Sequence, residues 1–369
     1  MRKVLVWAVA LLFLFSCASN KPQAVIFDTD MGNDVDDALA LAMLYRYADE
    51  GLVDLLGIMV NKNDPASAEY IDMVATWYGY GAVPIGVAEK PADSSADGRK
   101  GNPDGMNFVE AVVSKYDFPR SVSDYGSLPS AVSLYRKLLS AQPDGAVTIV
   151  STGFSTNLAA LLDSEGDEFS PLSGRELMAK KVKLVSVMAG NFREREPEKF
   201  PEFNVVRDIP SAQKFFAECP SPVAVSPFEL GWEIHYPAEA IETNLGYDRP
   251  NPVVEAYKLY LPMPYDRPTW DLTSVLYAIE GGEKFSPAAG KFYSVSEKFV
   301  EGPSGRVCID DFGMSSFTEA SESLTSSSKS LTSSSESLHT VLRVAPEDRQ
   351  AIIDRMVELT VQKKDRLQD

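Results

Sequence analysis

Short apolar runs alternate with segments of helical character along much of the chain. The runs Ala24 to Phe27, Val53 to Val60 and Val83 to Val87 contain few polar side chains, which is typical of strands buried on both faces. The segments Ala38 to Tyr47 and Ala66 to Tyr78 lie between them and contain many residues that favour helix. This alternation predicts an α/β fold with an open, mainly parallel sheet and helices on both faces.

The same alternation returns later in the chain. Ala146 to Val150 and Val182 to Met188 are predicted strands, and Asn157 to Leu162 between them is a predicted helix. A further strand is expected from His339 to Val344, followed by a helix from about Pro346 to Lys364. Ligands of such sheets bind at the carboxyl ends of the strands, so polar residues that follow strands are the first candidates for a site.

A serine-rich segment at about 315–338 interrupts this pattern. Glu322 to Ser328 is nearly repeated by Lys329 to Ser335, and Glu336 starts a third copy. Serine dominates and little can be buried, so we expect a flexible surface insertion made by local duplication. One Leu in seven residues is too few for a stable coiled coil.

The first 17 residues have the character of a targeting signal. Arg2 and Lys3 precede the apolar run Val4 to Phe15, which is short for a membrane span. The segment ends at Cys17 and resembles a bacterial lipobox, in which that Cys is lipidated. We therefore expect an exported lipoprotein facing the periplasm or the cell exterior, with residues 18–369 as its folded domain. An ordinary cleaved signal and an uncleaved anchor are the alternatives, and no later segment is apolar enough to span a membrane.

Composition narrows the range of partners. The 369 residues are 44% hydrophobic, which is ample for a sizeable core. The formal net charge of −18 argues against a nucleic-acid partner, because phosphate contacts need clustered Lys and Arg. Beyond Cys17 only Cys219 and Cys308 remain, and their spacing leaves open whether they pair. Zinc-type Cys and His spacing is absent from the sequence.

The segment Asp28 to Asp37 holds five aspartates in ten residues. Such dense like charges repel one another unless a cation is present, and oxygen ligands select calcium or magnesium. An EF-hand loop is excluded, because its sixth and twelfth positions would be Asn33 and Leu39 in place of Gly and Glu. Helix capping explains one or two of the aspartates. A phosphatase of the haloacid-dehalogenase type also uses Asp-x-Asp, but it does not need the further pair Asp36-Asp37.

Residues Asp28 to Ala38 resemble the N-terminal signature of the nucleoside hydrolase family, also called inosine-uridine preferring hydrolases. That signature is Asp-x-Asp-Pro-Gly-x-Asp-Asp-Ala. Here Met31 replaces Pro, and two residues are inserted before Asp-Asp-Ala. The insertion leaves open whether Asp34 or Asp36 fills the second carboxylate role.

Four more motifs follow in the family's order, so the resemblance extends over most of the chain. Ser151 to Ala159 is similar to the family's Thr-Gly-x-x-Thr-Asn segment, and Met188 to Asn191 to its glycine-containing strand end. Pro201 to Val205 contains its Glu-Phe-Asn, and Trp270-Asp271 stands where the family places its last calcium aspartate.

The resemblance implies a calcium ion held by Asp30, Asp37, Asp271 and the carbonyl of Thr152. The ion would bind the ribose hydroxyls and a water, and Asp30 would act as a catalytic residue by taking the water's proton. Cleavage builds positive charge on the ribose, which a carboxylate-rich floor stabilises. The expected contacts to the substrate are Asp36, Asn61, Asn191, Glu202, Asn204 and Asp271. Asn63 is the alternative to Asn61, and a plain turn residue is the other explanation for this asparagine.

The sequence shows no obvious general acid that could protonate the leaving base. Many family members place His before the last calcium aspartate, but this chain has Trp270 there, and we expect both of its histidines, His235 and His339, to be structural. Trp-Asp and the step from Asn191 to Glu202 resemble the purine-specific branch, in which an indole stacks on the base. Simple core packing is the other explanation for Trp270.

The resemblance therefore implies calcium-dependent hydrolysis of nucleosides or similar ribosides to ribose and free base, with a preference for purines. Two alternatives stay open: a calcium- and sugar-binding lipoprotein with weak or no turnover, and an Asp-x-Asp phosphohydrolase. Members of the family are often dimers or tetramers, so a homo-oligomer is also implied.

Overall fold

The computed structural model describes residues 21–94, 97–98, 104–195, 197–245, 250–280, 284–286, 291–293, 298–320 and 338–360. The expected signal segment with Cys17 lies outside these residues, as does most of the serine-rich segment, 321–337. Within the described ranges, no helix combines the length and the apolar character needed to cross a membrane.

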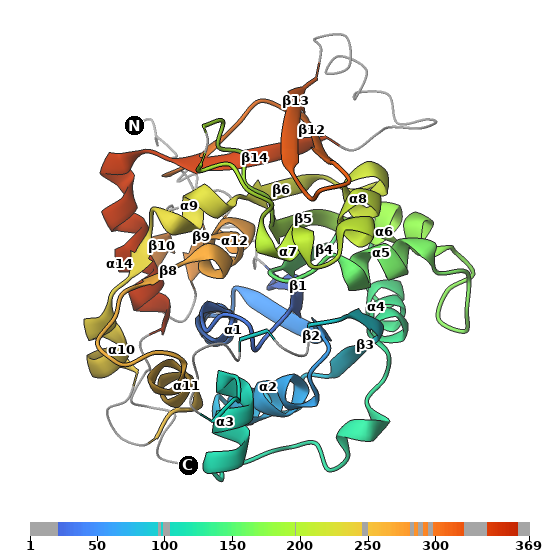
Figure 1. Cartoon of the computed structure of the whole chain (residues 1–369). Coiled ribbons are helices and arrows are strands. Elements are labelled where there is room, and N and C mark those ends of the chain that lie inside the picture. Colours follow the sequence, from blue (N-terminus) through green and yellow to red (C-terminus); the bar gives the residue numbers. More distant parts are fainter. Residues whose placement is uncertain are drawn as a thin grey trace, which may run out of the picture.

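A mixed sheet of ten strands runs through the described part of the molecule (Figure 1). Seven neighbouring strands are parallel, in the order β3-β2-β1-β4-β5-β6-β14. Three antiparallel strands extend the sheet beside β14. The parallel strands are β1 (Gln23–Thr29), β2 (Val53–Lys62), β3 (Ile85–Ala92), β4 (Val147–Ser151), β5 (Val182–Met188), β6 (Val223–Ser226) and β14 (His339–Val344), and the antiparallel ones are β11 (Phe299–Glu301), β12 (Gly305–Ile309) and β13 (Ser315–Glu319).

Both faces of the sheet are covered by helices. Successive side chains of β1 point to opposite faces, so Val25 and Phe27 join one core cluster and Ile26 joins the other. This confirms the predicted fold, a mainly parallel sheet between two helical layers. Helices α1 (Asp36–Asp49), α2 (Pro65–Trp77), α3 (Phe108–Lys115), α11 (Pro252–Tyr260), α12 (Trp270–Ile279) and α14 (Arg349–Thr360) pack on the first face, and α4 (Ala131–Ser140), α5 (Thr156–Asp163), α6 (Gly174–Lys181) and α8 (Ile209–Glu218) on the second.

Shorter elements complete the described chain. They are helices α7 (Phe203–Val206), α9 (Phe228–Trp232) and α10 (Ala238–Asn244), the 3-10 turns η1 (Tyr125–Ser127) and η3 (Pro346–Asp348), and the two-stranded pairs β7 (His235–Tyr236) with β8 (Arg267–Pro268) and β9 (Lys284–Ser286) with β10 (Lys291–Tyr293).

Strand β13 corrects one boundary of the sequence analysis. Ser315–Glu319 was expected to begin the flexible insertion, but it pairs with β12 as the last strand of the sheet. Ser315 is buried and Phe317 half-buried, whereas Ser316 and Thr318 are exposed. A serine-rich composition hid this alternation of buried and exposed positions, which is the character of a strand.

A buried ionic cluster holds the C-terminal helix α14 against α1 and α12. Arg355 contacts Glu280 at 2.6 Å (Nε to Oε1) and Glu50 at 3.6 Å (Nη2 to Oε2), and Tyr47 donates a hydrogen bond to Glu280. Removal of one partner of such a cluster leaves an uncompensated buried charge, which is strongly destabilising. Helices α1 and α12 are therefore fixed relative to each other, and both begin at the cavity described below.

Candidate active site

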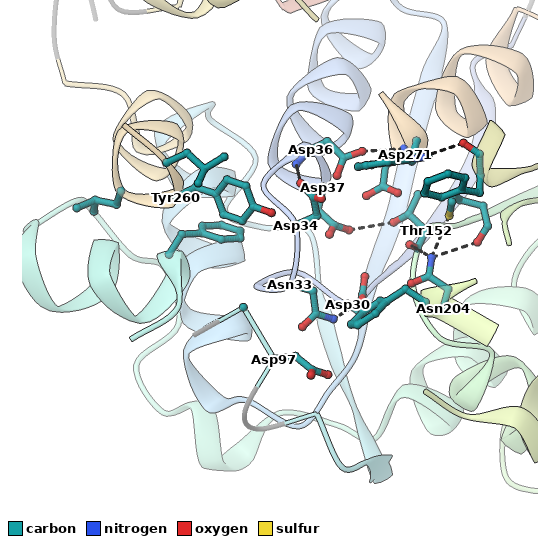
Figure 2. Close-up of a pocket in the computed structure, with 18 of the residues that line it drawn as sticks. Asp30, Asn33, Asp34, Asp36, Asp37, Asp97, Thr152, Asn204, Tyr260 and Asp271 are labelled. Carbon is teal, nitrogen blue, oxygen red and sulfur yellow. Dashed lines mark hydrogen bonds between the residues drawn. The ribbon is translucent and has the colours of Figure 1, made fainter. Parts of the chain in front are cut away.

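A cavity of about 840 Å³ lies where the chain order of the sheet reverses, at the carboxyl ends of β1 and β4. The lining has an acidic part and an aromatic part, and Figure 2 shows the carboxylates of Asp36, Asp37 and Asp271 grouped together, with Tyr260 apart from them. The acidic part consists of Asp30, Asp34, Asp36, Asp37, Glu202 and Asp271, and the aromatic part of Phe108, Phe203, Phe228, Tyr260 and Trp270.

The aspartate-rich loop turns directly from β1 into α1. Thr29 anchors this turn, because its hydroxyl donates to the carboxylate of Asp37 and accepts from the backbone N–H of Met31 at 3.0 Å. Helix α1 begins at Asp36, so Asp36 and Asp37 both lie in its first turn, where the helix dipole favours negative charge. Both side chains are buried at the bottom of the cavity.

Asp271 joins this pair from the first turn of α12. Its backbone N–H donates to the carboxylate of Asp36 at 3.0 Å, and its own carboxyl lies within hydrogen-bonding reach of Asp37. The hydroxyl of Thr152, which follows β4, donates to Asp37 at 3.1 Å. The structure thus brings together four of the residues predicted for metal and substrate binding.

Asp34 takes a different direction from Asp36 and Asp37. Its carboxylate is paired with the guanidinium of Arg267, with 2.9 Å between Oδ1 and Nε. Asp34 still lines the cavity, but its charge is paired with that of Arg267. The two carboxylates that face Asp271 are therefore Asp36 and Asp37, not Asp34.

Burial of so many carboxylates disfavours their charged forms. Desolvation raises the pKa of Asp30 to about 6, although the neighbouring Asn33 and Lys62 oppose the shift. Desolvation and repulsion from neighbouring aspartates raise the pKa values of Asp36, Asp37 and Asp271 well above the usual range. A divalent cation would offset this excess of negative charge.

The predicted metal ligands, Asp30, Asp37, Asp271 and the Thr152 carbonyl, offer only buried oxygen atoms, and such ligands suit a hard cation. In the described residues, however, no three Asp, Glu, His or Cys side chains are arranged as a ready-made metal site. Asp37 is bound to Thr29 and Thr152, and Asp30 accepts from the amide of Asn33. A cation would therefore compete with these donors for the carboxylates.

Lys62 is a buried cation beside the acidic part that the sequence analysis missed. Its ammonium donates to the side-chain oxygen of Asn33 and to the carbonyls of Ser94, at 3.2 Å, and Asp97, at 3.3 Å. Asn33 in turn donates to Asp30, so Lys62 supports that aspartate through one intermediate side chain. A lysine at the end of a mostly apolar strand, directly after Asn61, was the signal that could have identified it.

Gly153 allows the loop after β4 to approach the aspartate loop closely. A Cβ at this position would lie 2.5 Å from the backbone nitrogen of Asp30 and 2.7 Å from the side-chain oxygen of Asn61, and no larger residue fits there. The preceding Thr152 is fixed by a backbone hydrogen bond to Asp28 at 2.8 Å. Its carbonyl, predicted as a metal ligand, accepts from the amide of Asn204 at 2.9 Å.

Glu202 and Asn204 line the cavity beside Thr152. Glu202 caps the short helix α7 by accepting the backbone N–H groups of Asn204, at 2.9 Å, and Val205, at 3.3 Å. It also accepts the N–H of Gly190 at 3.0 Å, which ties α7 to the end of β5. Burial raises the pKa of Glu202 to about 7.

Asn61 and Asn191, predicted to contact the sugar, do not line the cavity. Asn61 is buried and donates to the Asp28 carboxylate at 2.6 Å and to the Phe154 carbonyl at 3.1 Å. Asn191 is also buried, and its amide donates to the carbonyl of Glu198 at 2.8 Å. Both amides thus support neighbouring backbone and side chains, and the geometry gives no support for a sugar contact.

Trp270 directly precedes Asp271 in α12 and forms part of a stacked aromatic group in the cavity lining. Its indole N–H donates to the Phe228 carbonyl at 2.9 Å, and its ring stacks on the Phe228 ring with 5.5 Å between centroids. Trp232 lies against both rings. Gly231 is required here, because a Cβ would lie 2.5 Å from the Cα of Trp270. The partners of Trp270 come from distant segments, so the sequence analysis did not find them.

Neither histidine lines the cavity. His235 is exposed, with Nε2 2.9 Å from the Trp232 carbonyl. His339 is buried in β14, where its Nδ1 accepts the backbone N–H of Val307 at 3.0 Å. Cys219, which is buried, and Cys308, which is exposed, do not form a disulfide with each other.

Comparisons with known proteins agree with this architecture. The sequence model of the family described as inosine-uridine preferring nucleoside hydrolase matches residues 25–316. No curated protein sequence matches the chain.

Among solved structures, the fold is similar to that of a plant nucleoside hydrolase, PpNRh1, at 17% identity and a TM-score of 0.62, covering 93% of this chain and all of that one. An inosine-guanosine nucleoside hydrolase matches at 17% identity and a TM-score of 0.63, covering 91% of this chain and 98% of that one. A purine-preferring ribonucleoside hydrolase from Gardnerella vaginalis matches at 16% identity and a TM-score of 0.61, covering 92% and 99%. The chain belongs to the inosine-uridine preferring nucleoside hydrolase family and is a hydrolase that acts on N-glycosyl bonds.

Proposed function

We propose that the chain is a calcium-dependent nucleoside hydrolase that prefers purine ribosides and releases ribose and the free base. One observation carries this proposal: a single cavity combines a buried group of carboxylates, at Asp36, Asp37 and Asp271, with an aromatic wall at Trp270. The first group suits a cation and a sugar that gains positive charge, and the second suits a flat base.

Calcium would be held by Asp30, Asp37, Asp271 and the carbonyl of Thr152. When bound, the ion would lower the pKa of a coordinated water and so supply a nucleophile near neutral pH. The oxygen-only set and its excess negative charge support calcium over zinc.

Asp30 is the proposed acceptor of the water's proton. The Asn33 amide donates to its carboxylate, and Lys62 behind it donates to Asn33, so the carboxylate is held in place to take the proton. Asp36, Glu202 and Asn204 line the same cavity and are the proposed partners of the ribose hydroxyls.

Trp270 is the proposed stacking platform for the leaving base. With no imidazole in the cavity lining, the base would be protonated from solvent while it lies against the indole. A purine offers a larger face and a basic ring nitrogen, which favours purine over uracil in such a site. Two solved structures of similar fold are named for inosine-guanosine or purine preference, which is consistent with this assignment.

An assay of the purified chain tests the proposal against its rivals. Inosine is incubated with protein that has been treated with a chelator and then restored with calcium, magnesium or zinc, and reducing sugar is measured. We expect ribose release that is lost on chelation and returned best by calcium. Phosphate release from sugar phosphates would instead indicate a phosphohydrolase, and calcium binding without ribose release would indicate a binding protein.

We also propose that the chain is exported and anchored to a membrane by a lipid at Cys17, with its catalytic domain in the periplasm or outside the cell. The basic pair Arg2-Lys3, the apolar run Val4 to Phe15 and the Cys itself support this. Cys17→Ser is expected to give a soluble or mis-processed form. Unchanged mass and unchanged membrane retention would contradict the proposal.

A further inference from the structure

Arg267 connects the aspartate loop to the aromatic part of the cavity lining. Its guanidinium is paired with Asp34, donates to the hydroxyl of Tyr260 at 2.9 Å, and lies 5.0 Å from the centroid of the Tyr260 ring. The same group lies 5.3 Å from the Trp270 ring. One cation thus contacts both rings, from α11 and from α12, and holds them relative to the loop before α1.

Arg267 acts from behind the cavity surface. Asp34, Tyr260 and Trp270 line the cavity, but Arg267 does not. Its side chain is mostly buried, and its backbone is fixed because Arg267 pairs with Tyr236 in the two-stranded sheet of β7 and β8. The arrangement is that of a support for the rings that face the substrate.

The charge of Arg267 also has an electrostatic effect on the leaving base. A base that gains a proton becomes positive, and an uncompensated cation behind the stacking ring would repel it. The carboxylate of Asp34 neutralises Arg267 at close range. The aromatic ring is thereby held by a cation without presenting a net positive charge to the base.

We propose that Arg267 and Asp34 form a positioning pair that sets the stacking surface of Trp270 and Tyr260 and so controls the departure of bases that need protonation. The inference rests on the proposed nucleoside hydrolysis and adds a specificity function to it. Asp34 is one of the two residues inserted into the aspartate loop before Asp36, so the pairing with Arg267 assigns a function to that insertion.

The test compares two ribosides that differ only in the leaving group. Inosine needs protonation and stacking of its base, whereas 4-nitrophenyl riboside releases a stable anion that needs neither. For Arg267→Met we expect the ratio of kcat/KM for inosine to that for the nitrophenyl riboside to fall by about tenfold or more, since small misplacements in a site are costly. Asp34→Asn leaves Arg267 without its carboxylate partner, so for this variant the ratio of the two kcat/KM values should fall further.

The double variant with Asp34→Asn and Arg267→Met should recover to the level of Arg267→Met alone, because it no longer carries an unpaired cation. Arg120→Met is the matched control, since Arg120 forms a comparable half-buried pair with Glu69 at 2.8 Å and neither residue lines the cavity. Its ratio should equal that of the wild type.

Three results would overturn the positioning pair: an equal loss on both ribosides, an unchanged ratio, or a double variant no better than Asp34→Asn. Loss of calcium binding in Asp34→Asn would also overturn it, because Asp34 would then belong to the metal site. If the wild type released ribose from neither substrate with calcium present, the proposed function itself would fail.

Discussion

The carboxylate of Asp36 accepts a hydrogen bond from the backbone N–H of Asp271, a residue 235 positions later in the chain. The bond joins the first turn of α1 to the first turn of α12. Two helix N-termini therefore converge on the same group of carboxylates, and their dipoles partly offset the negative charge there.

Removal of either of two proposed ligands should abolish calcium binding and activity together. Asp37→Ala or Asp271→Ala is expected to lower kcat/KM for inosine by more than about a hundredfold, because each removes a charged ligand from one ion. Calcium binding is measured by titration calorimetry on each variant. Asp34→Ala is the matched control from the same loop and should keep calcium, since Asp34 faces Arg267. If Asp34→Ala lost calcium and Asp37→Ala kept it, the two inserted residues would have to be placed elsewhere in the loop.

The chelated protein should be destabilised by the charge of Asp30 as the pH rises. Its pKa is about 6 in the folded chain against an ordinary value of 3.8, so the folded state binds more protons between these values. The contribution of that proton to the free energy of unfolding is on the order of 3 kcal/mol. It is fully present below pH 4 and is lost as the pH rises through 6.

The variant Asp30→Asn isolates this effect. In a chelator it should be more stable to urea than the wild type at pH 8, and the difference should shrink toward pH 4. Added calcium should stabilise the wild type at pH 8 and not the variant, because metal ligands bind in the deprotonated form. A wild type that is more stable than Asp30→Asn at pH 8 in chelator would contradict the prediction.

Trp270 should matter most for bases that are hard to release. We expect Trp270→Ala to slow inosine and adenosine turnover by more than it weakens binding of ribose, because stacking helps most as the base gains its proton. Uridine should be the poorer substrate of the wild type. His235→Ala should be nearly silent, since His235 is exposed outside the cavity lining. Faster uridine turnover combined with an inactive His235→Ala enzyme would refute this account.

His339 should make the fold sensitive to acid. Burial lowers its pKa to about 4 from an ordinary 6.5, and its Nδ1 must stay unprotonated to accept from Val307. The unfolded chain therefore binds more protons between pH 4 and 6.5, and stability falls as the pH drops through this window, by at most about 3 kcal/mol. In His339→Asn an amide oxygen can replace Nδ1, so urea unfolding of this variant should lose less stability over that window. Equal acid losses in both proteins would show that His339 does not contribute.

Sequence alone could predict the features whose signals are local. Strands such as Val182–Met188 are mostly apolar and largely buried, and the loop from Asp28 to Asp37 combines too many charges to be explained by solubility. Asp271 was identified through a short motif, and the structure does place it against Asp36 and Asp37. These residues carry their chemistry in the side chain itself.

Other features depend on contacts that no local pattern reveals. Asn61 lies at the carboxyl end of β2, as a site residue would, but its amide donates to the buried carboxylate of Asp28. In the sequence, Phe228 and Tyr260 look like ordinary aromatic residues. In the fold, Phe228 stacks on Trp270 and Tyr260 lines the same cavity. Lys62 became a buried cation only because Asn33 and the carbonyls of Ser94 and Asp97 surround its ammonium.

The outermost strands of the ten-stranded sheet, β3 and β13, decide how copies of this domain can meet. On β3, Val87 donates its N–H to the Pro129 carbonyl at 3.0 Å, and the exposed Glu89 and Lys90 are followed by Pro91, which has no N–H to offer. On β13, most of the side chains are exposed and polar. Charge, proline and a covering segment are the features by which edge strands resist the addition of a strand from another molecule. Neither β3 nor β13 is therefore expected to continue the sheet from one copy of the domain into the next.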